Sequence, residues 1–376
     1  MYLYSSYNKG ILIQFLTLLR AGLWEKEAKF CDCKDLDFSK LMQIAEEQSV
    51  VGLITAGLER VKNTTIPQPV VLQFIGATLQ IERRNKEMIF FVARLIEHLR
   101  RADVYAILVK GQGIAQCYER PLWRACGDID LLLTEENYKK AQHELTPLAS
   151  EIKNENKEIF HHEMTIDTWI VELHGSLCSR LWRSVNNGIK EAQLSVFFEG
   201  RVRSWMNSKS QIFLPRADED VIFVFTHILQ HFYHEGIGLR QVCDWCRLIW
   251  TYRENLDLRL LETRINRMGI MSEWKAFGAL AVGCLGMPEE SMPFYSSAPK
   301  WRRKADRIMA FILETGNFGH NRDFSYYSQK SLIRRKAVSL FRHTKDAFKY
   351  FMIFPLDSVK VWSKMIVEGF EKIIKG

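Results

Sequence analysis

The chain has 376 residues, of which 47% are hydrophobic and 26% are charged, and its formal net charge is +8. This length suits two or three domains with substantial cores, and the composition excludes a largely disordered protein. Eight scattered cysteines without a secretory leader argue against a disulfide-stapled secreted protein and favour a cytoplasmic one. No apolar stretch reaches the roughly 18 residues of a transmembrane helix, so we expect no transmembrane segment.

The positive charge is concentrated in the C-terminal segment. Residues 300–376 hold 17 Lys and Arg against 7 Asp and Glu, which leaves 35 against 37 in the rest of the chain. Such a segment can meet an anionic partner, such as RNA, a phosphorylated protein or a membrane surface. The alternative is a set of basic helices whose charges simply face solvent.

Residues 1–102 are expected to form an N-terminal helical segment. Apolar residues at helical spacing predict helices over Ile11–Trp24 and Phe38–Val61. The two prolines of residues 63–69 interrupt this pattern. A long helix is then predicted over Pro69–Ala102, because its apolar residues follow one side.

The pattern changes at residues 103–214, where short apolar runs alternate with helical stretches. This alternation predicts a small α/β core, in which helices pack on a mixed sheet. The expected strands are Tyr105–Val109, Asp128–Leu133, Phe160–Thr165, Thr168–His174 and Gln211–Leu214, and the expected helices are Ile114–Glu119 and Glu135–Leu148.

Beyond Gly175 the sequence becomes helical again, apart from the strand candidate Gln211–Leu214. We expect a helical domain at residues 215–290 that closes a cleft over the sheet, and a basic helical segment at residues 291–376. Met287–Pro299 is the expected linker between them, since it holds three of the nine prolines. The predicted fold class is therefore α+β, with helical segments on both sides of a small mixed sheet. The expected helices are 215–234, Leu239–Tyr252, Leu256–Met268, Trp274–Leu285, Ser331–Phe351 and Val359–Lys375.

Two aspartates on an expected strand are the first candidate functional residues. Asp128 and Asp130 are two residues apart, so their side chains share one face of the strand, and the aliphatic side chains between them take the other. Strands disfavour Asp, and ionised carboxylates beside an apolar run are costly unless they are neutralised. A divalent cation suits two such oxygen donors. The alternative is an edge strand whose carboxylates face water.

Glu172 and His174 are similarly two residues apart on another expected strand. If this strand lies beside the one that holds Asp128 and Asp130, three carboxylates converge. Two metal ions held by such carboxylates would clamp the phosphates of a nucleotide and activate an attacking hydroxyl. The alternative is that Glu172 faces solvent on a half-exposed strand.

The segment Lys110-Gly-Gln-Gly113 lies between an expected strand and an expected helix. Glycines at such a turn let backbone N–H groups approach a phosphate, and Lys110 adds a positive charge. The alternative is a strand-to-helix turn that uses glycine for geometric reasons alone.

Three histidines follow one face of an expected helix. His227, His231 and His234 are spaced at i, i+4 and i+7, and with Glu235 they offer ligands for zinc. No spacing of a known zinc class is complete, so we expect them to line the cleft or to cap the core.

The next expected helix contains two further pairs. Arg240 and Asp244 are four residues apart, so they are expected to pair with each other or to fix the helical domain to the sheet. Cys243 and Cys246 have the spacing of a metal or redox motif. They stand in an apolar helical stretch without a second pair, which favours buried structural cysteines.

Four segments together resemble a known family. Leu108–Gly111, Cys117–Pro121, Arg124–Leu132 and Val171–His174 are similar to the uncharacterised bacterial nucleotidyltransferase family of the DNA polymerase β-like superfamily. Parts of residues 214–249 resemble the helical half of that family.

The resemblance implies a set of site residues. Asp128 and Asp130 would be catalytic and hold Mg²⁺ or Mn²⁺, and Glu172 would be the third carboxylate, which is often Asp in the superfamily. The wider superfamily prefers Gly-Gly or Gly-Ser at the phosphate turn, so Gly111-Gln112 lacks that hydroxyl. The nucleotide would meet Lys110, Gly111, Gln112 and Arg124, and the cleft would be lined by His174, His231, His234 and Arg240.

The reaction that the resemblance implies is transfer of a nucleoside monophosphate from ATP or another NTP, with release of pyrophosphate. The acceptor is a hydroxyl of a protein, a small molecule or RNA. The rival hypothesis is a non-catalytic nucleotide-binding module that serves an assembly of the toxin–antitoxin or polysaccharide-locus kind.

Overall fold

The computed structural model describes residues 8–30, 36–317 and 348–374. Most of the expected helix Ser331–Phe351 lies outside the described residues. Two of the eight cysteines, Cys31 and Cys33, lie outside them as well.

The described residues of the N-terminal part form four helices. The expected helices at the two ends of this part are confirmed as α1 and α4, but the single helix expected over Phe38–Val61 is wrong. Ser49 has a φ of +55°, which a right-handed helix cannot contain, so the chain turns there and forms α2 and α3 instead. The bounds are α1 Lys9–Leu23, α2 Phe38–Glu47, α3 Val51–Leu58 and α4 Gln68–Arg101.

The sheet has seven strands in the order β3-β4-β5-β2-β1-β7-β6. The pairs β2–β5 and β1–β7 are parallel, and the others are antiparallel. The five expected strands are present, and β3 and β6 add the two edges that were not expected. The bounds are β1 Ile107–Val109, β2 Asp128–Leu132, β3 Ala149–Ile152, β4 His161–Ile166, β5 Trp169–His174, β6 Val202–Asn207 and β7 Ser210–Pro215.

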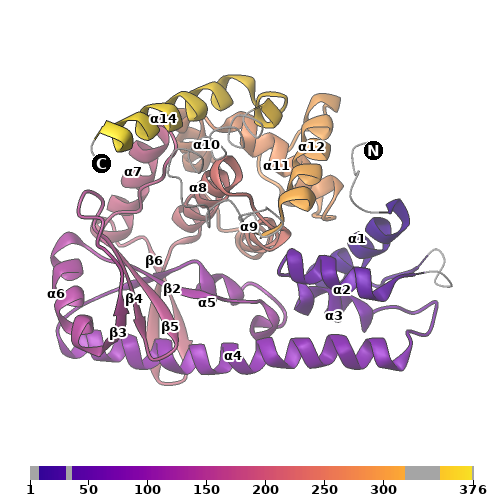
Figure 1. The fold of residues 1–376 in the computed structure, drawn as a ribbon, viewed down its shortest axis with the longest axis horizontal. Helices are drawn as coiled ribbons and strands as arrows, with labels where there is room; N and C mark the ends of the chain where they lie inside the picture. Colours follow the sequence, from indigo (N-terminus) through magenta and orange to yellow (C-terminus); the bar gives the residue numbers. More distant parts are fainter. Residues whose placement is uncertain (1–7, 31–35, 318–347, 375–376) are drawn as a thin grey trace.

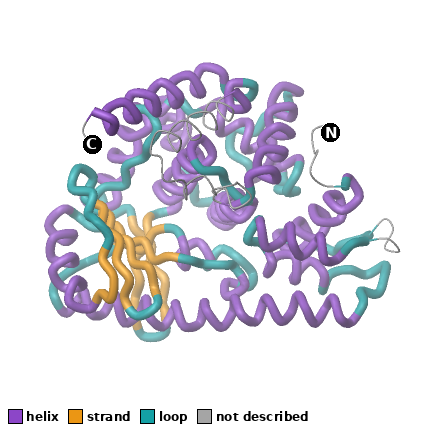
Figure 2. Tube along the Cα trace, viewed as in Figure 1, coloured by secondary structure: helices purple, strands orange, loops and turns teal. Residues whose placement is uncertain are grey.

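The two faces of the sheet belong to different cores. The second half of α4 and the helix α6, Glu135–Leu145, cover one face, where Leu131 and Val171 pack against Leu95. Leu132 and other side chains of the opposite face join the core of the helical remainder of the molecule. Figure 1 shows α4 running along one side of the sheet, and Figure 2 shows the strands gathered at one end of that helix.

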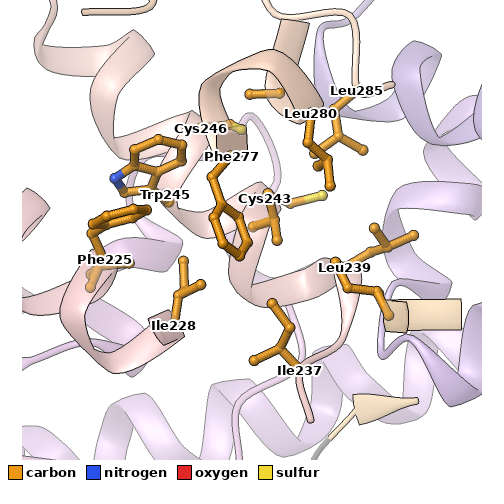
Figure 3. Close-up of a cluster of buried hydrophobic side chains, with 14 of the residues drawn as sticks. Phe225, Ile228, Ile237, Leu239, Cys243, Trp245, Cys246, Phe277, Leu280 and Leu285 are labelled. Carbon is orange, nitrogen blue, oxygen red and sulfur yellow. The ribbon is translucent and has the colours of Figure 1, made fainter. Parts of the chain in front are cut away.

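Helices of the C-terminal half pack above the sheet around a core rich in aromatic residues. Figure 3 shows Phe225 against Trp245 and Phe277, in the same buried cluster as Cys243 and Cys246. Both cysteines are fully buried, as expected of structural cysteines, and burial raises the pKa of both thiols. The helices are α7 Arg183–Phe198, in the stretch beyond Gly175 that was expected to be helical, α8 Ala217–His234, α9 Leu239–Tyr252, α10 Leu258–Met268, α11 Met271–Gly283, α12 Pro299–Thr315 and α14 Pro355–Ile374.

The N-terminal helices pack directly against this C-terminal half. The indole of Trp24 donates a hydrogen bond to the Leu285 carbonyl at 2.6 Å, and its ring meets that of Trp250 edge-on. Gln48, in the turn between α2 and α3, accepts a hydrogen bond from the Leu239 N–H at 3.0 Å. The seven-stranded mixed sheet flanked by helices confirms the expected α+β class. Among the described helices, none is long and apolar enough to cross a membrane.

Candidate active site

The carboxylates singled out in the sequence lie on two neighbouring strands. The parallel register of β2 and β5 sets Asp130 beside Glu172, and Leu132 beside His174. Asp128 shares the face of Asp130, because two residues of a strand make one pleat. This pairing supplies the strand adjacency that the three-carboxylate hypothesis requires, and the shared face opens toward α8.

A short network of hydrogen bonds joins these side chains. Asp130 Oδ1 accepts from Lys110 Nζ and from His174 Nε2, both at 2.8 Å. Glu172 Oε2 lies 3.4 Å from the same His174 nitrogen and 3.2 Å from His161 Nε2. Three basic side chains therefore surround two of the carboxylates.

The carboxylates of this network differ in their electrostatics. Burial raises the pKa of Asp128, and the neighbouring Asp130 raises it further. Burial alone would raise the pKa of Asp130 too, but Lys110 and His174 outweigh it and lower that pKa. Hydrogen bonds from His161 and His174 likewise outweigh burial and lower the pKa of Glu172. Such displaced pKa values are typical of functional sites.

Lys110 reaches the carboxylates from a strained turn. Its φ is +58°, a value that costs a non-glycine residue on the order of 1–3 kcal/mol and that recurs at functional sites. The next residue, Gly111, has a φ of +37°, and a Cβ there would lie 3.4 Å from the Asp128 carbonyl oxygen. The turn thus uses glycine for its backbone conformation, since a Cβ would make only ordinary van der Waals contact with β2.

Gln112 points away from this face. Its amide donates a hydrogen bond at 2.9 Å to Asn85 on α4, and it lines neither cavity at the carboxylates. The side chain of this predicted nucleotide-binding residue therefore tethers the turn to α4.

Arg124 lines a small cavity at Asp128 and Asp130, but its guanidinium is paired within the protein. Its Nε and Nη2 donate to the two oxygens of Asp244 at 3.0 and 2.6 Å, and its Nη1 lies 2.8 Å from Cys126 Sγ. All three guanidinium nitrogens of this predicted triphosphate ligand are thus engaged within the protein. Asp244 pairs with Arg124 and not with Arg240, so it fixes α9 to the segment before β2.

Arg240 is a second guanidinium beside the carboxylates. It lines a small cavity together with Lys110, Asp128 and Asp130. Its Nη1 donates to the Ala125 carbonyl at 3.1 Å, and its buried Nε has no hydrogen-bond partner among the described residues. Burial and the nearby Arg124 lower the pKa of Arg240. This cation is therefore under-satisfied and stands next to the acidic face.

A cleft of about 540 Å³ opens beside the carboxylates, within the size range of small-molecule sites. The strands contribute Asp128, Glu172 and the predicted cleft residue His174 to its lining. Lys110 lines it from the turn after β1, and His231 lines it from α8. His234 is buried on the same helix but is not among the lining residues.

His227 was considered as a zinc ligand and instead sits between the two cavities, both of which it lines. Its ring centroid is 4.3 Å from that of His231, whose Nδ1 is 2.7 Å from a Glu235 oxygen. Burial and the charge of Lys110 hold the pKa of His227 well below its usual value. A neutral imidazole therefore faces the cleft from α8.

His161 is a site residue that the sequence did not single out. The antiparallel pairing of β4 with β5 sets it opposite His174. Within the described part of the chain, only His161, Glu172 and His174 gather metal-capable side-chain atoms, all within 4.8 Å of one another. The signal was the hairpin itself, because the short turn between its two expected strands fixes which residues face each other.

The acidic face fits a divalent cation. Asp128 lies at the cleft, and its carboxylate has no hydrogen-bond or ion-pair partner among the described residues. Asp130 and Glu172 add oxygens close by, and hard oxygen donors are what Mg²⁺ and Mn²⁺ prefer. An unpaired carboxylate beside two others is a poor arrangement without a cation to neutralise it.

Comparison with protein families finds one match. The family model described as uncharacterised nucleotidyltransferase matches residues 34–285, which include every residue of the face described above. No curated protein and no solved structure matches the chain. The match covers well over half of the 376 residues, and so the chain belongs to the uncharacterised nucleotidyltransferase family.

Proposed function

We propose that this protein transfers a nucleoside monophosphate from ATP or another NTP to an acceptor hydroxyl and releases pyrophosphate. One observation carries the proposal: Asp128, Asp130 and Glu172 share one face of the sheet, where Asp128 and Glu172 line a cleft with Lys110 and Asp130 lines the small cavity beside it. Family membership supports the transferase class. In this proposal the nucleotide lies in that cleft.

Asp128, Asp130 and Glu172 would hold Mg²⁺ or Mn²⁺ on the acidic face. When bound, such an ion neutralises phosphate charge and lowers the pKa of a coordinated hydroxyl. The remaining work of the protein is to position the triphosphate and the acceptor, which is the main route to rapid phosphoryl chemistry.

We propose that Lys110 and Arg240 bind the phosphates of the NTP. Both are cations at the edge of the acidic face, and Arg240 has a buried nitrogen without a partner among the described residues. We propose that Arg124 and Gln112 position the site and do not contact the phosphates. Arg124 holds Asp244 on α9, and Gln112 holds the turn of Gly111 against α4.

The wider setting is also a proposal. We assign the fold to the DNA polymerase β-like superfamily and the protein to the cytoplasm. We divide it into an N-terminal helical segment (1–102), the sheet core (103–214), a helical domain that closes the cleft (215–290) and a basic C-terminal segment (291–376). The acceptor is a protein, a small molecule or RNA, and the excess of 10 positive charges in residues 300–376 suits an anionic partner.

Labelled nucleotides test the reaction. The purified protein is incubated with lysate fractions and with an NTP labelled at either the α- or the γ-phosphate. Nucleotidyl transfer places the α-label on the acceptor and sends the γ-label into pyrophosphate. We expect the α-label in one fraction of protein, RNA or small molecules, and we expect Asp128→Asn to abolish the transfer.

The matched control is Glu87→Gln, which removes an exposed carboxylate on α4 and should leave transfer unchanged. Label transferred from the γ-position alone would contradict nucleotidyl transfer. Nucleotide binding without pyrophosphate release in any fraction would favour the non-catalytic binding module.

A further inference from the structure

We propose that His161, Glu172 and His174 form a binding position for a first-row transition-metal ion, and that this position prefers Mn²⁺ to Mg²⁺. The inference rests on the proposed function for its role, because it names the class of ion at the same site. It goes further because it adds two imidazoles to the metal ligands, whereas the sequence analysis predicted carboxylate ligands alone.

The donor atoms come from three adjacent strands of one sheet face. His161 on β4 lies opposite His174 on β5, and their ring centroids are 4.9 Å apart. Glu172 precedes His174 by two residues and therefore shares its face. Asp130 on β2 lies beside Glu172 and offers a fourth donor. Strands hold ligands more precisely than loops do.

The distances between donor atoms suit a single ion. Glu172 Oε2 lies 3.2 Å from His161 Nε2 and 3.4 Å from His174 Nε2. His174 Nε2 lies 2.8 Å from Asp130 Oδ1. Nitrogen and oxygen ligands at about 2.0–2.2 Å from a six-coordinate ion such as Mn²⁺ lie roughly 2.8–3.1 Å from adjacent ligands. Small movements of the side chains would therefore bring the four atoms around one ion.

The chemistry of the donors decides which ion is preferred. Mg²⁺ is hard and takes oxygen ligands and water, whereas imidazole suits later and softer divalent ions. Two imidazoles with one or two carboxylates therefore favour a transition-metal ion over Mg²⁺. The site is also reachable, since all three residues line the cleft and the side chains of His161 and Glu172 are 29% and 22% exposed.

The competing explanation is that the two imidazoles only hold Glu172 in place by hydrogen bonds. Both explanations use the same contacts, so stability alone does not separate them. Direct detection of imidazole nitrogen bound to the ion separates them, because an imidazole that only donates a hydrogen bond to Glu172 does not coordinate the ion.

The test uses the full chain without nucleotide and Mn²⁺ as the probe. Electron spin-echo measurements detect the coupling between bound Mn²⁺ and histidine nitrogen, and calorimetry gives the affinity for Mn²⁺ alone and in competition with Mg²⁺. We expect nitrogen coupling, and Mn²⁺ binding at least about tenfold tighter than Mg²⁺ binding. His161→Gln should weaken Mn²⁺ binding by about 10–100-fold and leave Mg²⁺ binding nearly unchanged.

His143→Gln is the matched control, because it removes an exposed histidine on α6. Bound Mn²⁺ without nitrogen coupling, or equal affinity in wild type and His161→Gln, would overturn the proposal. The wild-type spectrum decides the question even if the variant does not fold. Because no nucleotide is present, the result is independent of the transfer assay: Mg²⁺-supported transfer without nitrogen coupling would defeat this inference and leave the proposed function intact.

Discussion

Asp244 joins α9 to the segment that precedes β2. Its two oxygens accept from Arg124, and Oδ1 also accepts from the Tyr118 hydroxyl at 2.7 Å. The side chains of Arg124 and Asp244 are each only 5% exposed, so this is a buried ion pair. Such pairs add little net stability over apolar replacements, but they are costly to break on one side.

We therefore expect Asp244→Leu to lower the free energy of unfolding by about 3–5 kcal/mol, because it leaves the Arg124 guanidinium buried without its anion. The double change Arg124→Met/Asp244→Leu should recover most of that loss. Urea unfolding of the three proteins measures both values. A double variant as unstable as the single one would show that the pair has a different role.

At the residue scale, the sequence predicted what depends on neighbours in the chain. The alternation around Asp128 and Asp130 placed both carboxylates on one face, as the structure has them. The partner of Arg124 lies 120 residues away, and no local pattern indicates such a contact. His161 was missed because its role comes from the strand opposite it.

Small residues let α1 and α3 pack closely. A Cβ on Gly22 would lie 1.9 Å from the Leu53 carbonyl oxygen, and one on Gly57 would lie 2.1 Å from that of Leu18. These contacts involve backbone atoms of the facing helix, which cannot move aside as a flexible side chain can. The glycines therefore fix the separation of the two helices.

At this scale we expect Gly22→Ala to destabilise the protein by at least about 1–3 kcal/mol through overpacking. Gly76→Ala is the control, since Gly76 is an exposed position of α4 and a Cβ there would meet no atom within 4 Å. The control should gain about 0.4–1 kcal/mol from its better helix propensity. Thermal unfolding of the two variants measures the contrast, and equal stabilities would contradict the close packing.

The strong periodic elements were predicted well from the sequence, and the weak ones were not. The helix α4 and the five inner strands were expected within a few residues. The edge strand β6 was missed, since its alternate side chains are exposed and it contains no apolar run. The break at Ser49 was missed as well, because neither glycine nor proline marks it. The pairing of β2 with β5 depends on tertiary structure. From the sequence we could say only that three carboxylates converge if these two strands are neighbours.

For the whole molecule, one buried carboxyl links three helices. Glu273 on α11 is fully buried and accepts a hydrogen bond from the Tyr233 hydroxyl of α8 at 2.9 Å. Burial, followed by the carboxylate of Asp357 on α14, raises the pKa of Glu273 to about 8. Burial lowers the pKa of the nearby Lys304 on α12, although Glu273 raises it.

The sign of the pH dependence follows from that raised pKa. The folded protein binds the Glu273 proton more tightly than the unfolded chain does, so this stabilisation is complete below about pH 4.5 and is lost as the pH rises through about 8. Between pH 6 and 8 the unfolding free energy of wild type should fall relative to that of Glu273→Gln, by up to about 1.4 kcal/mol per pH unit.

Urea unfolding of both proteins across this pH range measures the difference, and other titrating groups cancel in the comparison. Glu254→Gln, which changes an exposed carboxylate, should follow wild type. A difference between wild type and Glu273→Gln that stays constant with pH would contradict the raised pKa.

The central claim is that the cleft beside Asp128, Asp130 and Lys110 binds a metal–nucleotide complex. Calorimetric titration with a non-hydrolysable NTP analogue and Mg²⁺ or Mn²⁺ tests it most directly. Asp128→Asn is the informative variant, because the Asp128 carboxylate has no partner among the described residues whose loss would disturb the fold. We predict metal-dependent binding to wild type and to Glu87→Gln, and at least a tenfold loss in Asp128→Asn. No binding of any NTP analogue to wild type, or equal binding to Asp128→Asn, would contradict the claim.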